Sequence, residues 1–274
     1  MLRSVSTVVA VSFISLAVAS CATTMTGRKQ LNMISDDKMD AMGIAAFTDL
    51  VQKGSVEADP ATNAYVRCVA DAIIAVVPEQ YAPKDAEWEV VVFEDPTPNA
   101  FALPGAKIGV HTGMLELAQT PDQLAAVIGH EVGHVLLEHG NERMSQALMA
   151  DGALQLGSIA VGATGTGYGD IIVGGLGVGA QYGVILPFSR KHESEADEVG
   201  QRFMAEAGFD PRASIELWEN MKAKADGQPA QWLSTHPAHD TRIANLQARL
   251  PEALELYQRS QPQGCKRGGH SPPS

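Results

Sequence analysis

The sequence has few cysteines and few basic residues, and each shortage excludes a class of protein. Three cysteines in 274 residues are too few for a disulfide scaffold or for a metal cluster held by cysteine thiolates. Twenty lysines and arginines stand against 32 aspartates and glutamates, so the net charge is −12. A nucleic-acid partner is not expected, because no basic stripe is present to release counterions from a phosphate backbone.

Long apolar runs are also lacking at the N-terminus, where the apolar residues 8–18 are too few to span a membrane comfortably. A short positive region before them and small residues after them are typical of a signal peptide. The ending LAVASC, residues 16–21, resembles a bacterial lipobox. That resemblance implies cleavage before Cys21 and acylation of Cys21, with an ordinary signal peptide as the alternative. Ala22, in place of aspartate, implies an outer-membrane lipoprotein whose domain lies in the periplasm.

The predicted organisation is a signal peptide at 1–20, a lipidated polar tether at 21–34, a folded domain at 35–257 and a disordered tail at 258–274. The hydrophobic fraction of 45% suits a folded globular domain. Cys68 and Cys265 are the two cysteines that remain once Cys21 is set aside for acylation. In an oxidising periplasm they could form a disulfide, or they stay apart because Cys265 lies in the tail.

One stretch, residues 120–140, has complete signals for a buried helix. Thr120 is a candidate N-cap, Pro121 suits the first helical position, and Gln123 completes a capping box. Gly140 suits the C-terminal end. Apolar residues occupy more than one side of this helix, which is typical of a helix surrounded by protein.

The same helix contains the sequence HEVGH, which predicts a metal site. His130 and His134 are four residues apart, so both imidazoles project from one face and can bind a single Zn²⁺. Glu131 can then take a proton from water at the metal. The alternative is two partly buried histidines and a solvated glutamate. The metal site is favoured because unpaired polar groups are costly in a buried helix, and because Gly129 and Gly133 leave room beside the ligands.

A second helix, predicted within residues 188–207, contains the sequence ESEAD. Glu193 and Asp197 share one face, and such a pair is usually a solvated acidic surface. Beside an HExxH helix, Glu193 can instead be the third metal ligand, and Asp197 can accept a hydrogen bond from a ligand histidine. Glu195 points about 160° away from that face at ~3.6 residues per turn, so it is the poorer ligand.

Two short strands are predicted, at 88–93 and 107–112, with a Pro-Gly turn in the segment between them. An exposed edge of so small a sheet could bind an extended peptide by adding a strand; a plain structural hairpin is the alternative. The glycine-rich segment 152–187 has three possible structures: a membrane-dipping hairpin, a helical hairpin at the rim of the site, or a mobile flap. Its glycines and Asp170 interrupt any spanning run, which favours the helical hairpin.

Taken in order, these motifs resemble the M48 family of zinc metallopeptidases, in its periplasmic lipoprotein branch. The resemblance covers about residues 26–250 and adds two motifs, TGRKQL at 26–31 and THP at 235–237. It implies an α+β fold: a mostly helical gluzincin with a small sheet whose edge strand lines the active-site cleft.

The resemblance also assigns roles to individual residues. It implies that His130, His134 and Glu193 bind one Zn²⁺ and that Glu131 is catalytic. His236 would lie near the metal, either stabilising the oxyanion or occupying the fourth position in a latent state. Asp197 would support a ligand, and Arg242 would be a structural partner near the site. The segment expected to pair with substrate backbone is Asn99-Ala100-Phe101-Ala102-Leu103-Pro104-Gly105.

Two positions depart from the family pattern. Ala106 stands where the family often has a second glycine after Pro-Gly, and His111 stands where it usually has no histidine; no role is assigned to His111. The implied function is a zinc-dependent endopeptidase anchored to the bacterial outer membrane. Its expected substrates are misfolded or misassembled envelope proteins, and the outer-membrane assembly machinery is a candidate partner. The alternative is a chaperone-like assembly factor with latent or little protease activity.

Overall fold

The chain is mostly helical and has two small sheets. The computed structural model describes residues 21–83, 86–149, 188–224, 235–236 and 240–267. Its helices are α2 (Asp36–Lys53), α3 (Pro60–Ile74), the 3-10 turn η1 (Glu79–Tyr81), α4 (Thr112–Leu117), α5 (Pro121–Leu136), α9 (Arg190–Glu206), α10 (Arg212–Lys224) and α12 (Asp240–Arg259). Its strands are β1 (Cys21–Thr23), β2 (Lys29–Leu31), β3 (Glu89–Phe93), β4 (Ala100–Leu103) and β5 (Lys107–His111). The predicted α+β class is confirmed. The glycine-rich segment 152–187 lies outside the described residues.

The larger sheet has the strand order β3-β5-β4, so β4 is an edge strand. β5 pairs in parallel with β3 and antiparallel with β4. A hairpin between the two predicted strands is therefore wrong, because the chain between them forms a third strand and then the turn at 104–106. Ala106 has a φ of 61°, a left-handed conformation that glycine adopts more easily. That conformation explains why glycine is common in the family at this position.

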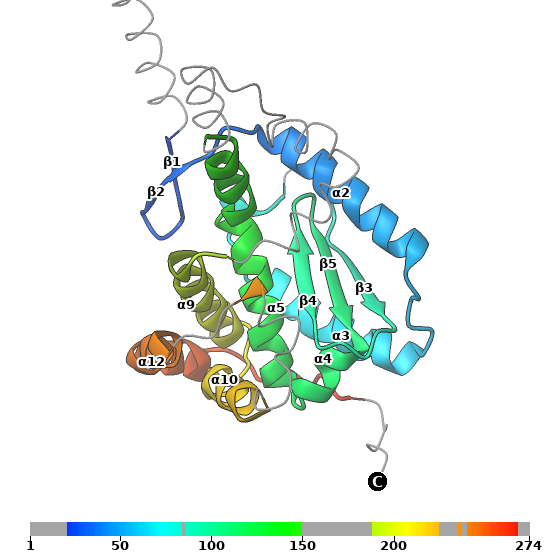
Figure 1. The fold of residues 1–274 in the computed structure, drawn as a ribbon. Coiled ribbons are helices and arrows are strands. Elements are labelled where there is room, and N and C mark those ends of the chain that lie inside the picture. Colours follow the sequence, from blue (N-terminus) through cyan, green and yellow to red (C-terminus); the bar gives the residue numbers. More distant parts are fainter. Residues whose placement is uncertain (1–20, 84–85, 150–187, 225–234, 237–239, 268–274) are drawn as a thin grey trace, which may run out of the picture.

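α5 is the central element, with the sheet and α2 on one side of it and α9, α10 and α12 on the other (Figure 1). Thr120 caps it as predicted, since its hydroxyl accepts a hydrogen bond from the backbone N–H of Gln123 at 3.1 Å. The helix ends at Leu136, earlier than the predicted end at Gly140. The reason is Glu138, whose φ of 53° turns the chain into a new helix that includes residues 139–149.

α9 crosses α5 at a pair of glycines. A Cβ atom on Gly200 would lie 2.7 Å from the backbone nitrogen of His130, closer than real side chains approach. Gly129 on α5 faces the same point, because its own Cβ would lie 3.0 Å from the carbonyl oxygen of Gly200. The two backbones are therefore in direct contact beside the HExxH motif. α12 packs in turn on α9.

The N-terminal segment is not a loose tether in the structure. β1 and β2 form an antiparallel hairpin, with Cys21 opposite Leu31. Arg28, in this hairpin, makes ion pairs with Glu142 and Glu195. These ion pairs, in which both carboxylates are buried, fix residues 21–31 to the body of the protein, where the sequence predicted a polar tether.

The C-terminal segment also differs from the prediction of a disordered tail. α12 continues to Arg259, and Cys265 is buried and forms a disulfide with Cys68 of α3. The Arg267 guanidinium donates a hydrogen bond of 2.7 Å to the carbonyl oxygen of Leu115. The disulfide, which the sequence left open, holds residues 260–267 against the domain. Among the described helices, none is long and apolar enough to cross a membrane.

The contact between α5 and α9 generates a stability prediction. We expect Gly200→Ala to lower the free energy of unfolding by about 1–3 kcal/mol, because the added methyl group overlaps the backbone of α5. The control is Gly140→Ala in the helix that includes 139–149, where the new Cβ would meet only Met39 at 3.8 Å. That control should raise stability by roughly 0.5–1 kcal/mol. Urea unfolding followed by circular dichroism measures both, and equal stability of the two variants would contradict the close crossing.

Candidate metal centre

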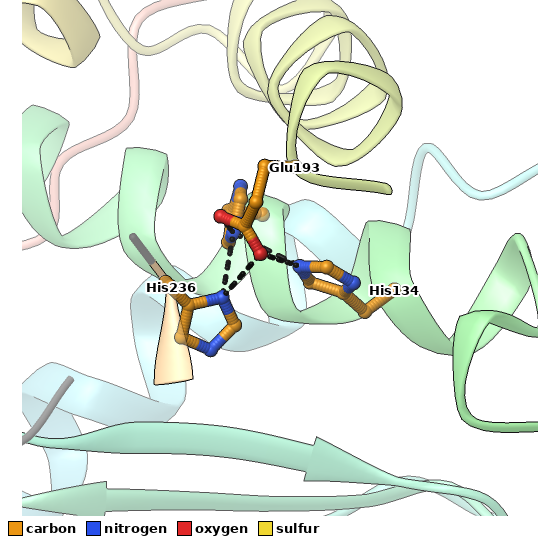
Figure 2. Close-up of side chains that lie close together, drawn as sticks. His134, Glu193 and His236 are labelled. Atoms are coloured by element: carbon orange, nitrogen blue, oxygen red, sulfur yellow. Dashed lines mark hydrogen bonds and ion pairs between the residues drawn. The ribbon is translucent and has the colours of Figure 1, made fainter. Parts of the chain in front are cut away.

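Four buried side chains from three parts of the chain converge beside α5 (Figure 2). His130 and His134 lie one helical turn apart on α5. Glu193 lies in the first turn of α9, which Ser189 caps by accepting a hydrogen bond of 3.2 Å from the N–H of His192. His236 is the fourth. One nitrogen or oxygen atom from each of the four lies within 4.8 Å of the others.

The three predicted ligands lie close enough together to bind a single ion. The Nε2 atoms of His130 and His134 lie 3.0 Å apart. The Glu193 carboxylate lies 3.5 Å from the first of these nitrogens and 3.4 Å from the second. All three side chains are buried. This arrangement brings the predicted ligand trio together.

The surroundings of the two imidazoles favour a cation at this site. Burial lowers the pKa of His134 well below its usual value. Burial also lowers the pKa of His130, but hydrogen bonds to Asp197 and Glu193 outweigh it and raise that pKa to about 9. The carboxylates of Asp197 and Glu193 thus favour a positive charge beside the two ring nitrogens. A metal ion bound there would supply that charge, and two imidazole nitrogens with a carboxylate are a donor set that zinc prefers.

Asp197 contacts His130, and Arg242 contacts both Asp197 and Glu193. Asp197 Oδ1 lies 3.0 Å from His130 Nδ1, so the ligand's second nitrogen faces a carboxylate. Arg242 donates two hydrogen bonds of 2.6 Å to Asp197 and also contacts Glu193. Burial raises the pKa of Asp197, but the charge and hydrogen bonds of Arg242 outweigh it and lower that pKa. The structure thus places both residues next to the ligand set.

His236 reaches into the ligand set, and Glu131 lies next to it. His236 Nδ1 is 3.2 Å from His130 Nε2 and 3.1 Å from Glu193 Oε1. Its other ring nitrogen, Nε2, is 3.4 Å from Glu131 Oε1. Phe188 stacks on the rings of both His134 and His236, with centroid distances of 4.0 and 5.2 Å. His236 therefore occupies the side of the ligand set that Glu131 faces.

A cavity of about 150 Å³ opens beside His134, between β4, α2 and the helix that includes 139–149. Part of the predicted substrate segment lines it: Ala102, Leu103 and Pro104. Asn99, Ala100 and Phe101 are buried elsewhere, and Phe101 packs in a separate cluster with Phe47 and Phe93. Gly105 lies in the turn after β4, where its N–H donates a hydrogen bond of 2.7 Å to Asp40. His111, which had no predicted role, packs against Phe93 and Phe101, away from the ligand set.

Sequence reasoning missed a second group of polar residues behind His134. His139 is fully buried, and its Nδ1 lies 2.9 Å from Nδ1 of His134. Glu195, set aside as a ligand, lies 3.4 Å from the other nitrogen of His139. The TGRKQL motif supplies Thr26 and Arg28, which both donate hydrogen bonds to Glu195. That motif was visible in the sequence, but its partners lie more than 100 residues away.

The charge states of this group follow from its surroundings. Burial lowers the pKa of His139 to about 4, so its ring is neutral at pH 7. Burial raises the pKa of Glu195, but hydrogen bonds from His139, Thr26 and Arg28 outweigh it and lower that pKa to about 2. Glu195 is therefore an anion that Arg28 compensates, and His139 is a neutral ring between two polar neighbours.

Two imidazoles of an HExxH helix and a glutamate of a second helix define a metallopeptidase-type centre. Residues 60–250 match the sequence model of peptidase family M48, and the chain belongs to this family. The predicted membership is therefore confirmed.

Several characterised proteins are similar to this chain over much of its length. The mitochondrial metalloendopeptidase OMA1 of Schizosaccharomyces pombe is 35% identical over 235 residues, covering 84% of this chain and 66% of that protein. Metalloendopeptidase OMA1 of Danio rerio is 39% identical over 185 residues, covering 63% of this chain and 37% of that protein. The beta-barrel assembly-enhancing protease of Escherichia coli is 30% identical over 169 residues, covering 59% and 34%. The chain thus spans between about a third and two thirds of the length of these relatives.

These relatives correct one prediction. A location at the bacterial outer membrane was expected from the lipobox-like residues 16–21, but relatives from yeasts, a fish, a plant and mammals are named as mitochondrial proteases. The prediction is therefore wrong. Its physical basis was a short local pattern, which reports on a possible processing step and not on the compartment. The acylation of Cys21 stays a prediction.

The ligand geometry predicts a specific response to zinc. We expect the metal-free protein to be stabilised by about 2.7 kcal/mol when free zinc is present at one hundred times its dissociation constant. Glu193→Gln should lose most of this stabilisation, because it removes the anionic ligand between the two imidazoles. Glu131→Gln is the matched control and should keep it. Thermal unfolding with and without zinc measures the effect, and an equal zinc response in both variants would contradict the ligand assignment.

Proposed function

We propose that this protein is a zinc-dependent endopeptidase that cleaves unfolded or misassembled proteins. The observation that carries the proposal is the convergence of His130, His134 and Glu193 around one point, with the Glu131 carboxylate beside it. A cavity and the edge strand β4 adjoin the same point. The family supports this proposal, and so do relatives whose names describe metalloendopeptidases and a protease.

The chemistry divides between the metal and the chain's own residues. When bound, Zn²⁺ would polarise the scissile carbonyl and make water more acidic. His130, His134 and Glu193 would hold the ion and leave one position for a reacting group. Glu131 would accept the proton of the attacking water and deliver it to the leaving amine, since its carboxylate is buried next to the ligand set. Asp197 would keep the His130 ring oriented, and Arg242 would keep Asp197 ionised.

The position of β4 supports a preference for extended substrates. β4 is the edge of its sheet and lies next to α5, so its outer backbone groups can pair with a peptide strand. Such pairing recognises backbone rather than sequence, and it requires a segment without structure of its own. Ala102, Leu103 and Pro104 border the cavity beside His134, where one substrate side chain would fit. Folded proteins would be poor substrates for this arrangement.

Two roles were expected for His236: stabilising the oxyanion, or occupying the fourth metal position in a latent state. We further propose that the structure represents the latent state. The Nδ1 atom of His236 lies 3.2 Å from His130 Nε2, compared with 3.0 Å for the Nε2 atom of His134, so it would be a fourth ligand of a bound ion. Its Nε2 atom faces Glu131 at 3.4 Å, where the attacking water would have to lie. His236 would have to swing away before hydrolysis. A resting state of this kind also fits the alternative function, a chaperone-like factor with little turnover.

The role of Glu131 is tested by Glu131→Gln. We expect this variant to bind zinc like the wild type and to hydrolyse unfolded casein about 10²–10⁴-fold more slowly, because the amide cannot accept a proton. Zinc content and casein cleavage should be measured on the same preparations. Undiminished cleavage would overturn the assignment. If the variant is inactive as a protease yet restores the wild-type phenotype to a deletion strain, the chaperone-like function is favoured instead.

The role of His236 is tested by His236→Ala. If His236 holds the site in a latent state, its removal should increase the initial rate of casein hydrolysis several-fold, with zinc still bound by the other three ligands. The increase should vanish when Glu131→Gln is added, which rules out a contaminating protease as its source. A large decrease in rate with unchanged zinc content would contradict latency and would favour oxyanion stabilisation by His236.

A further inference from the structure

His134 has two ring nitrogens with different surroundings. Nε2 points toward His130 and Glu193, and Nδ1 points away from them (Figure 2). Nδ1 meets Nδ1 of His139 at 2.9 Å, a normal hydrogen-bond distance. His139 Nε2 in turn lies 3.4 Å from Glu195 Oε2. A line of polar contacts therefore leads from one metal ligand, through a buried histidine, to a buried carboxylate.

One arrangement of protons satisfies every contact on this line. A His134 ring that binds a metal through Nε2 carries its proton on Nδ1. That N–H donates to His139 Nδ1, which must then be the unprotonated nitrogen. The proton of His139 lies on Nε2 and is donated to Glu195. The carboxylate at the end of the line thus selects, through His139, the tautomer of His134 that can bind a metal.

The N-terminal hairpin holds Glu195 in place. Thr26 donates a hydrogen bond to one carboxylate oxygen of Glu195, and Arg28 donates to the other. The guanidinium of Arg28 also makes two hydrogen bonds to Glu142, at 2.9 and 2.6 Å. Arg28 is therefore shared by two carboxylates on different helices. Glu142 also accepts a hydrogen bond from His192 at 3.1 Å, and within the described part of the chain it makes no hydrogen bond to His139 or to a metal ligand.

We propose that His139 and Glu195 are positioning residues for the metal ligand His134, and that the β1–β2 hairpin is part of the metal centre through Arg28. The proposal rests on the proposed function to the extent that His134 must bind a metal. Each imidazole ligand would then have its own supporting residues: Asp197 and Arg242 for His130, and the group around His139 for His134. Its consequence is that residues far from the substrate side of the site control metal affinity.

The first test compares two substitutions of His139 by zinc affinity, measured on the full-length protein by competition with a chromophoric chelator. His139→Phe keeps the ring but removes the acceptor, so zinc affinity should fall about 10–100-fold. His139→Asn places an amide oxygen near the position of Nδ1 and should recover most of that loss. Urea unfolding of the metal-free proteins gives their stabilities separately. Equal zinc affinity of His139→Phe and wild type would overturn the proposal.

A second pair of variants keeps the test valid if His139→Phe does not fold. Glu195→Leu and Glu142→Leu each remove one of the two carboxylates that pair with Arg28, so both should lower stability. Zinc affinity should fall about tenfold in Glu195→Leu. It should stay within about twofold of wild type in Glu142→Leu, which leaves the line to His134 intact. Equal losses of affinity in the two variants would show a general structural effect and would overturn the proposal.

A double-mutant cycle tests the part played by the hairpin. Arg28→Gln should weaken zinc binding in the wild-type background but change it less than about twofold in the His139→Phe background, because the line is already broken there. Independent, additive losses would contradict transmission through His139. Zinc binding by the wild-type protein distinguishes failure of this proposal from failure of the proposed function. Absence of zinc binding by the wild type would end the endopeptidase assignment, whereas normal binding that ignores residues 28, 139 and 195 would end the positioning proposal alone.

Discussion

The buried ion pair between Arg242 and the two carboxylates of α9 is the constraint on which the rest of the structure depends. Glu193 and Asp197 are both buried, and two unpaired carboxylates at such positions would be very costly. Arg242 reaches both from α12, and its guanidinium stacks on the ring of Trp218 in α10 at 3.8 Å. Three helices are thus arranged around one cation. Arg242 balances one of the two negative charges, and a divalent metal ion held by Glu193 and the imidazoles would more than balance the other.

Sequence patterns predicted the parts of the site that depend on a single helix. The four-residue spacing of His130 and His134, and that of Glu193 and Asp197, places each pair on one face whatever the fold. The glycines of the first helix were expected to leave room beside the ligands, and in the structure Gly129 meets Gly200 of α9. That the two faces meet each other could not be deduced from spacing. The family resemblance supplied that step, together with His236 and Arg242.

The parts that sequence patterns did not predict are contacts between residues distant in the chain. A polar segment at 21–34 and a tail rich in glycine and proline have the composition of flexible termini. In the structure, Arg28 is held by two buried carboxylates that local composition cannot identify, and Cys265 is held by the disulfide to Cys68 that the sequence left open. His139 was likewise an unremarked residue after the HExxH motif, because its role depends on Glu195, 56 residues later.

The two imidazole ligands differ in what supports them, and the difference has chemical meaning. His130 faces a carboxylate directly, which increases its electron donation to a metal, whereas His134 faces a neutral imidazole that only relays a more distant carboxylate. His130 is tied to α12 near the C-terminal end, and His134 to the β1–β2 hairpin near the N-terminal end. Both ends of the domain must therefore be folded before the ligands are fully oriented. On the positioning proposal, a chain that has not yet folded at either end would therefore bind the metal weakly.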